Sequence, residues 1–124
     1  MAKYEVVAKN EPDDLIAGHE VSILTAGLVI SSGQGILKRG SILGVVKADG
    51  KGKLCDKSKA DGSEVAKYVL PEDVDTSEGD VTVAVWKTGI FNRDSIIFGG
   101  ESGPSDHEDE LRNVNIHLRD SVNH

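Results

Sequence analysis

The sequence predicts an α+β fold that is predominantly β: a compact domain of short antiparallel strands with one short helix in its C-terminal region. Short Val/Ile/Leu runs are interrupted at close intervals by glycines. Apolar and polar residues alternate within these runs, which is typical of strands that bury one face and are joined by tight turns. A single capping pattern, late in the chain, indicates the start of a helix.

The length and the N-terminal composition predict one domain preceded by an arm. A chain of 124 residues is most simply one domain, and a domain of this length buries roughly 65% of the surface that it exposes when unfolded. Residues 1–14 are polar and charged, include Pro12, and have no hydrophobic period beyond Val6 and Val7. Such a segment buries too little apolar surface to offset its ordering entropy. We therefore expect a flexible arm over residues 1–14 and a single β-rich domain over residues 15–124.

Two apolar segments predict buried strands in the first half of the domain and near its middle. Residues 21–30 supply strand material, in which Gly27 predicts a bend. Residues 66–70 form a second apolar run behind the turn dipeptide Asp61-Gly62. Each run is short, as expected for a sheet built from many small strands.

The dipeptide Asp49-Gly50 predicts a hairpin. Asp-Gly readily takes the positive φ values of a type I′ turn, which matches the twist of the two strands that it joins. Residues 45–48 and 53–56 flank this dipeptide. They are therefore expected to pair as antiparallel strands.

Residues 81–86 form the strongest predicted strand, because β-branched and aromatic residues pack well on a pleated sheet. The three valines of this segment share one face. Trp86 shares the other face with Thr82 and Ala84, so a large apolar group lies opposite the valines. Burial of both faces, or a contact of Trp86 with another subunit, would explain this arrangement, and placement in the core is the favoured interpretation.

The segment Pro104–Glu108 carries the helix signal. Ser105 can act as the N-cap, and Glu108, three residues later, can complete a capping box. The apolar residues then change from a helical spacing to the alternation of a strand. The pattern predicts a short helix near residues 105–113 and a final strand near residues 114–119.

Charge and hydropathy exclude two kinds of partner. Lys and Arg total 14 against 21 Asp and Glu, a net charge of −7 that repels a phosphate backbone and offers no counterion-release driving force. Nucleic acid is therefore not an expected direct partner. The N-terminus lacks the apolar core of a secretion signal, and no stretch approaches the ~20 apolar residues of a membrane span. We expect a protein that is not exported and does not contact a membrane.

No spacing of reactive side chains predicts an active site or a metal centre. Ser102 lies between glycines, but the second glycine comes one place early for a nucleophile elbow. The four histidines lack the paired spacing of a zinc site, and Cys55 has no second thiolate beside it. The favoured interpretation of Cys55 is an inert, half-buried small side chain. We predict no catalytic residue, no cofactor and no metal ligand.

The order of the short sequence elements resembles the lambda-type head decoration proteins of tailed bacteriophages. The elements that carry the resemblance extend over nearly the whole chain. They are Gly33-Gln34, Leu37-Lys38-Arg39-Gly40, Leu43-Gly44, Asp61-Gly62, Val69-Leu70 followed by Glu72-Asp73-Val74-Asp75, Gly79-Asp80, the strand Val81 to Trp86, and Gly89-Ile90-Phe91-Asn92. Pro71 and the second glycine of Gly33-Gln34-Gly35 are less typical of the family.

The resemblance implies a structural virion protein without enzymatic activity. Proteins of this family form homotrimers at local threefold positions on the outer surface of the expanded head, and they reinforce the shell against the pressure of packaged DNA. The implied partners are the major capsid protein and two further copies of the chain. The implied location is the virion, after synthesis in the host cytoplasm.

The arm supplies the candidate capsid-binding residues, and Trp86 is a candidate for the trimer contact. A flexible arm can add a strand to an exposed sheet edge of the shell protein, gaining main-chain hydrogen bonds with little demand on sequence. Tyr4 and Val6 flank the polar Glu5 in the alternation that such a strand requires. The candidate residues are Ala2, Lys3, Tyr4, Glu5, Val6 and Val7.

Two other function classes remain open from the sequence. A small β-barrel hydrolase or carbohydrate-binding protein would need a cleft in which Ser102, His107 and an acid converge. A tail or baseplate adaptor would use the same kind of fold at another place in the virion.

Overall fold

The computed structural model describes residues 15–120, and most of its regular structure is strand. The strands are β1 (Ile16–Gly18), β2 (Thr25–Ile30), β3 (Ile36–Leu37), β4 (Ile42–Val45), β5 (Gly52–Leu54), β6 (Tyr68–Val69), β7 (Val74–Asp75), β8 (Val81–Trp86), β9 (Gly89–Asn92) and β10 (Ile116–Arg119). The helices are the 3-10 turn η1 (Arg93–Ser95) and α1 (Pro104–Asn113). The predicted α+β, predominantly β class is confirmed.

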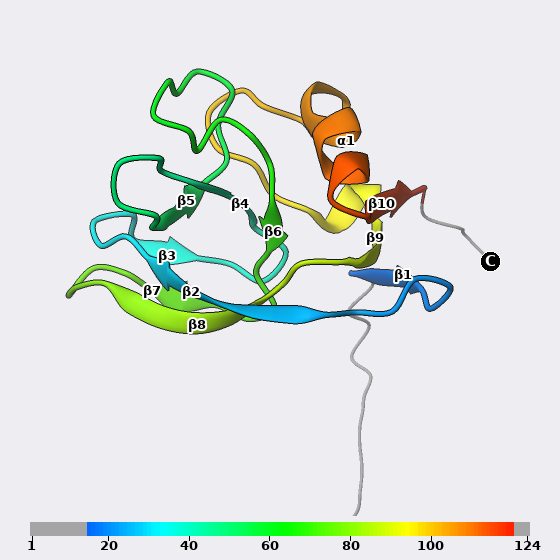
Figure 1. Ribbon diagram of the computed structural model, residues 1–124, viewed down its shortest axis with the longest axis horizontal. Coiled ribbons are helices and arrows are strands. Elements are labelled where there is room, and N and C mark those ends of the chain that lie inside the picture. Colours follow the sequence, from blue (N-terminus) through cyan, green and yellow to red (C-terminus); the bar gives the residue numbers. More distant parts are fainter. Residues whose placement is uncertain (1–14, 121–124) are drawn as a thin grey trace, which may run out of the picture.

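Five strands close into a barrel in the order β2-β5-β4-β6-β8 (Figure 1). Its longest pairing is antiparallel and joins β2 to β8 from Thr25 opposite Trp86 to Ile30 opposite Val81. The β8 strand has the bounds that its alternation predicts. The pairing continues through Gly27 without a change of register, so Gly27 lies inside β2 and not at the predicted bend.

A hairpin forms around the predicted dipeptide, but its paired strands are β4 and β5 and not residues 45–48 and 53–56, and its turn has a different geometry. β4 and β5 pair antiparallel, with Val45 opposite Gly52. Gly50 has a φ of 72°, whereas Asp49 does not have a positive φ, and a type I′ turn requires both. The Asp49 carboxylate instead accepts the backbone N–H of Lys51 at 3.0 Å. This local side-chain bond stabilises a longer loop, which is a common use of Asp in turns.

The segment predicted as a strand over residues 66–70 is regular only at β6. β6 pairs with β4 on one side and with β8 on the other. The backbone N–H of Leu70 donates to Ser41 at 2.9 Å, and that of Lys67 donates to Leu43 at 2.9 Å, so the flanking residues still follow β4. Ala66 and Leu70 are fully buried, as the apolar run predicts.

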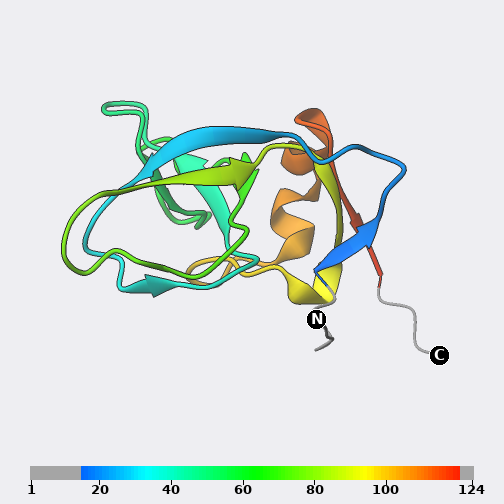
Figure 2. The same ribbon diagram turned by 90° about the horizontal axis from the view of Figure 1, so that it is seen from below.

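A second sheet lies beside the barrel and has the order β1-β9-β10. β1 is antiparallel to β9, whereas β10 is parallel to it. Figures 1 and 2 both place this sheet together with α1 at one end of the molecule, beyond the barrel. Asn115 joins α1 to β10 with a φ of 66°, a left-handed conformation that Asn tolerates well. The predicted strand at residues 114–119 therefore begins two residues late, because its first two residues end the helix.

The helix begins one residue before its predicted start and uses a different cap. Gly103 is the N-cap and Pro104 is the first helical residue, a position that suits the fixed φ of proline. The backbone N–H of Gly103 donates to the Asp106 carboxylate at 2.8 Å. The predicted Ser105 and Glu108 capping box is therefore wrong. Glu108 instead forms ion pairs with Arg93 and Arg112.

Two apolar clusters fill the interior. The first, between the barrel and α1, comprises Leu15, Ile42, Cys55, Ala66, Val69, Phe91, Ile96, Leu111 and Ile116. The second, inside the barrel, comprises Ile30, Leu37, Leu43, Leu70, Val74 and Val85. Val81 and Val83 pack against the second cluster, and Trp86 packs against the first. Both faces of β8 are therefore used, and the core placement favoured for Trp86 is confirmed.

The Gln34 side chain completes the hydrogen bonding between β2 and β5, where the barrel closes. β2 and β5 share only the register pair Ile30 and Gly52. Beyond it, Gln34 Oε1 accepts the N–H of Leu54 at 2.9 Å, and Gln34 Nε2 donates to the carbonyl oxygens of Ser31 at 2.8 Å and Gly52 at 3.3 Å. The amide therefore takes the place of a missing stretch of strand between β2 and β5.

Replacing Gln34 by Ala is expected to lower the free energy of unfolding by about 2–4 kcal/mol, because three backbone groups each lose a hydrogen bond, although the Gly52 carbonyl oxygen still accepts from the Ser31 N–H. Chemical denaturation monitored by circular dichroism measures the change. Ser32→Ala is the matched control, since Ser32 lies in the same turn and is exposed, and it should stay within about 0.5 kcal/mol. Equal unfolding midpoints for Gln34→Ala and the wild type would contradict this role of the amide.

Candidate functional site

The predicted capsid-binding residues 2–7 lie outside the described residues, and the structure shows only where the domain body begins. Leu15 is buried, with 2% of its surface exposed, and its carbonyl oxygen accepts the N–H of Asn92 at 2.8 Å. β1 follows at once and forms one edge of the three-stranded sheet. The start of the body is thus fixed to β9 by main-chain hydrogen bonds.

Trp86, the candidate for the trimer contact, is half-buried and held by two neighbouring side chains. Its ring stacks on Phe91, with ring centroids 5.5 Å apart and an interplanar angle of 16°. The guanidinium carbon of Arg39 lies 5.1 Å from the ring centroid on a cation–π contact. Packing against the core therefore accounts for the position of Trp86. A trimer contact through the exposed part of its side chain stays a prediction.

Ser102 and His107, which a hydrolase would need together, serve separate structures. Ser102 Oγ accepts the backbone N–H of Lys57 at 2.7 Å and so ties the loop after β5 to the start of α1. His107 is buried, and its ring faces Cys55 and Glu110. Within residues 15–120 no hydrogen bond joins Ser102 to His107. The geometry therefore gives no support to a nucleophile at Ser102.

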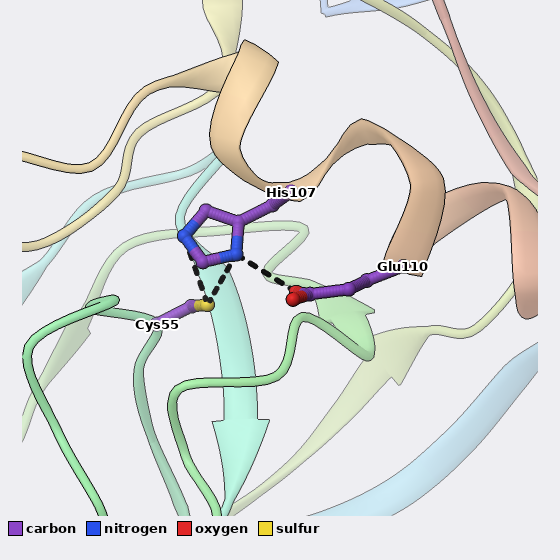
Figure 3. A group of neighbouring side chains, drawn as sticks. All are labelled: Cys55, His107 and Glu110. Atoms are coloured by element: carbon purple, nitrogen blue, oxygen red, sulfur yellow. Dashed lines mark hydrogen bonds and ion pairs between the residues drawn. The ribbon is translucent and has the colours of Figure 1, made fainter.

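The structure brings Cys55, His107 and Glu110 together, which the sequence analysis did not predict (Figure 3). His107 and Glu110 lie one turn apart on α1, and Cys55 follows β5. His107 Nδ1 lies 2.8 Å from Glu110 Oε1. Cys55 Sγ lies 3.7 Å from His107 Nδ1 and 3.8 Å from Nε2. The sequence feature that could have indicated this group is the His-x-x-Glu spacing on the predicted helix, because residues three positions apart lie on one face of a helix.

Cys55 is more buried than predicted, with none of its surface exposed. Burial, followed by the negative charges of Glu110, Asp56 and Glu64, raises the pKa of its thiol to about 12. The S–H group points to the carbonyl oxygen of Glu64 at 3.5 Å. At neutral pH the free thiol is therefore protonated, which does not suit a nucleophile because the thiolate is the reactive form.

Two open depressions lie on the surface, and neither is lined by the Cys55, His107 or Glu110 side chains. The first, of about 350 Å³, lies where the barrel closes and is lined in part by Gln34, Lys53 and Lys59. The second, of about 300 Å³, is lined in part by Lys67 and Lys87. The Cys55, His107 and Glu110 side chains are therefore not part of either depression.

The outer face of the β2–β8 pair is a candidate contact surface. Its exposed residues are Thr25, Gly27, Val29, Thr82 and Ala84. They alternate with the residues that point into the barrel, and the two strands are in register along this face. All five residues are uncharged, although 28% of the whole chain is charged. A surface of this composition is suited to packing against another protein.

A small β-barrel domain with an uncharged exposed face and a buried thiol has the features of a structural binding protein. The family model of the bacteriophage lambda head decoration protein D matches residues 6–110, and the chain therefore belongs to this family. A comparison with curated proteins gives no match. Family membership makes the chain a structural phage protein that decorates the head, binds a phage capsid and is located in the virion. Within the described residues, no helix is both long and apolar enough to cross a membrane.

Proposed function

We propose that the chain forms a homotrimer that binds the major capsid protein on the outside of the expanded head, at local threefold positions, and stabilises the shell against packaged DNA. The observation that carries the proposal is the family match over residues 6–110, which begins within the proposed arm. The protein acts by binding and carries out no reaction. Of the alternatives, a hydrolase loses support because Ser102 and His107 do not meet, and a tail or baseplate adaptor does not account for a head decoration family.

The mode of attachment that we propose is strand addition by residues 2–7. Each arm would pair with an exposed sheet edge of the capsid protein through main-chain hydrogen bonds. The body begins at an edge strand, β1, which supports an arm that leaves the domain at its periphery. Three arms on one trimer convert weak single contacts into tight binding, since after one arm docks the others face an effective concentration near the millimolar range. A symmetric cap also fits a place where three equivalent edges meet.

The net charge of the chain favours a protein partner over the packaged genome. The chain carries −7 at neutral pH, and a phosphate backbone would be repelled by it. The uncharged β2–β8 face offers a surface for contact with a neighbouring subunit or with the shell. The proposed stabilisation therefore acts from the outside, by linking capsid proteins to one another.

The purified chain is expected to have a solution mass of about three times 13.2 kDa and to sediment with expanded heads. Light scattering measures the mass, and co-sedimentation with expanded and unexpanded heads from the same phage measures binding. Unexpanded heads are the control, and they should retain little of the protein because the threefold sites form on expansion. A monomer or dimer in solution, or equal retention by both kinds of head, would contradict the proposal.

A further inference from the structure

Three side chains with metal-ligand chemistry meet between the barrel and α1, and the proposed function gives them no role. Cys55 Sγ, a nitrogen of His107 and a carboxylate oxygen of Glu110 all lie within 4.8 Å of one another. Cys55 and His107 are buried, with 0% and 1% of their surfaces exposed. Buried polar groups are usually fully paired, yet the only hydrogen-bonding contact of His107 Nε2 within residues 15–120 is the thiol at 3.8 Å.

One distance in this cluster, that between Cys55 Sγ and His107 Nδ1, equals the separation that a zinc ion imposes on two of its ligands. Zinc binds sulfur at about 2.3 Å and nitrogen or oxygen at about 2.0–2.2 Å, so two ligands of a tetrahedral ion lie roughly 3.3–3.7 Å apart. Cys55 Sγ and His107 Nδ1 are 3.7 Å apart. His107 Nδ1 and Glu110 Oε1 are 2.8 Å apart, because they share a hydrogen bond. A movement of the Glu110 carboxylate by roughly half an ångström or more would bring this pair to the ligand separation and replace the hydrogen bond by two bonds to the ion.

Neighbouring groups hold all three side chains in position. The backbone N–H of Ala66 donates to Glu110 Oε1 at 2.9 Å. The ring of Phe98 stacks on the His107 ring, with centroids 4.9 Å apart. The backbone of Cys55 donates to Ile42 at 2.8 Å and accepts from Gly99 at 2.7 Å. Support of this kind around the ligands raises metal affinity, because little ordering is left to occur on binding.

The charge and accessibility of the cluster suit a divalent cation. The carboxylates of Glu110, Asp56 and Glu64 all act on Cys55, so the surroundings are negative. A thiolate and a carboxylate together neutralise a 2+ ion, and the imidazole adds a neutral ligand. The Glu110 side chain is 34% exposed, which leaves an entry route from solvent on that side.

We propose that Cys55 Sγ, His107 Nδ1 and Glu110 Oε1 form a zinc site that fastens α1 to the barrel. When the ion binds, the S–H bond breaks, the sulfur keeps the electron pair and binds zinc, and one proton is released to solvent. The imidazole proton moves to Nε2, which frees Nδ1 as a ligand. A water or the Glu64 carbonyl oxygen supplies the fourth ligand. The ion joins parts of the chain that are 52 residues apart in sequence, so it stabilises the native state as a crosslink does.

The test uses the full-length chain, treated with a chelator and then titrated with Co²⁺ or Zn²⁺. Co²⁺ reports the site directly, because a thiolate ligand produces a sulfur-to-cobalt charge-transfer band in the near ultraviolet. We expect one Co²⁺ per chain, loss of the band on addition of Zn²⁺, and a rise of about 5–10 °C in the unfolding temperature at zinc concentrations well above the dissociation constant. Mg²⁺, which prefers oxygen ligands, should produce no shift.

Variants of two ligands and of an exposed neighbour on α1 separate the site from surface binding. Cys55→Ala should abolish the charge-transfer band, and Glu110→Gln should weaken Co²⁺ binding by about tenfold or more. Glu110→Gln keeps an oxygen that can accept from Ala66, so it tests the site even if Cys55→Ala does not fold. Asp109→Asn is the matched control, because the Asp109 side chain lies on α1 and is 94% exposed, and it should bind as the wild type does.

The inference does not depend on the proposed function, since the readouts are an absorption band and an unfolding temperature. A wild-type chain with no charge-transfer band and no zinc-dependent shift would overturn it. A band of full strength in Cys55→Ala, or unchanged affinity in Glu110→Gln, would overturn the assignment of the ligands.

Discussion

Deletion of residues 2–13 is expected to abolish binding to expanded heads while the trimer and the fold remain. The described contacts of the domain body begin at Leu15, so the deletion removes none of them. The loss should be about 100-fold or more in apparent affinity, because each trimer loses three tethered contacts at once. Co-sedimentation with expanded heads measures the loss, and light scattering and circular dichroism of the truncated chain provide the control. A truncated protein that covers heads at wild-type density would refute attachment by the arm.

Single proline substitutions in the arm test whether attachment occurs by strand addition. Along an added strand, alternate N–H groups point to the partner strand, and proline removes one N–H group. Glu5→Pro and Val6→Pro should therefore differ, one of them weakening binding strongly and the other much less. Glu5→Ala and Val6→Ala are the matched controls, because they keep both N–H groups. Equal effects of the two prolines would point to side-chain anchoring instead.

Gly44→Ala is expected to produce the largest destabilisation of any single methyl group added to the barrel. Gly44 lies inside β4, and a Cβ atom there would come within 2.2 Å of the carbonyl oxygen of Ser63 and 2.6 Å of its carbonyl carbon. Both atoms belong to the backbone, so no side-chain rotation can relieve the overlap. We expect a loss of about 3 kcal/mol in the free energy of unfolding, measured by chemical denaturation.

Gly27→Ala is the matched control for Gly44→Ala. Gly27 is also in the middle of a barrel strand, but a Cβ atom there would have no neighbour within 4 Å. Its stability should change by no more than about 0.5 kcal/mol, and the change should tend towards stabilisation because alanine restricts the unfolded chain. The solution mass of each variant should be measured as well, so that altered assembly is not mistaken for altered folding. Similar unfolding midpoints for the two variants would show that the close approach of β4 to Ser63 does not limit this position.

Secondary structure was predicted well in segments where neighbouring residues all favour the same element. Residues 81–86 form β8 because β-branched side chains alternate there over a full strand, and that pattern requires no knowledge of the partner strand. The helix was placed within one residue, although its cap was assigned to Ser105 and not to Gly103. Proline at the first helical position and an acid three residues after Gly103 carried the correct signal.

At the Asp49-Gly50 turn, the local sequence pattern does not decide the turn geometry. The dipeptide predicted the β4–β5 hairpin correctly but not the type I′ geometry, because the Asp49 side chain bonds to the backbone of Lys51. Two local options compete at such a dipeptide, and the surrounding register decides between them. At β10, too, two local options compete. Residues 114 and 115 could begin the strand or end α1, and in the structure they end α1.

The amino-acid sequence alone determined the strand-rich class, the acidic net charge and the family, because alternation, composition and the order of short elements can all be read along the chain. Only the tertiary structure decided that Gln34 closes the barrel, that Gly44 must lack a side chain, and that Cys55 meets His107 and Glu110. Each of these depends on atoms that are close in space but far apart in the chain: Gln34 and Leu54 are 20 positions apart, Gly44 and Ser63 are 19, and Cys55 and His107 are 52. Contacts of that separation arise from the way the sheets close and from the side of the barrel that α1 covers, and no local pattern specifies either.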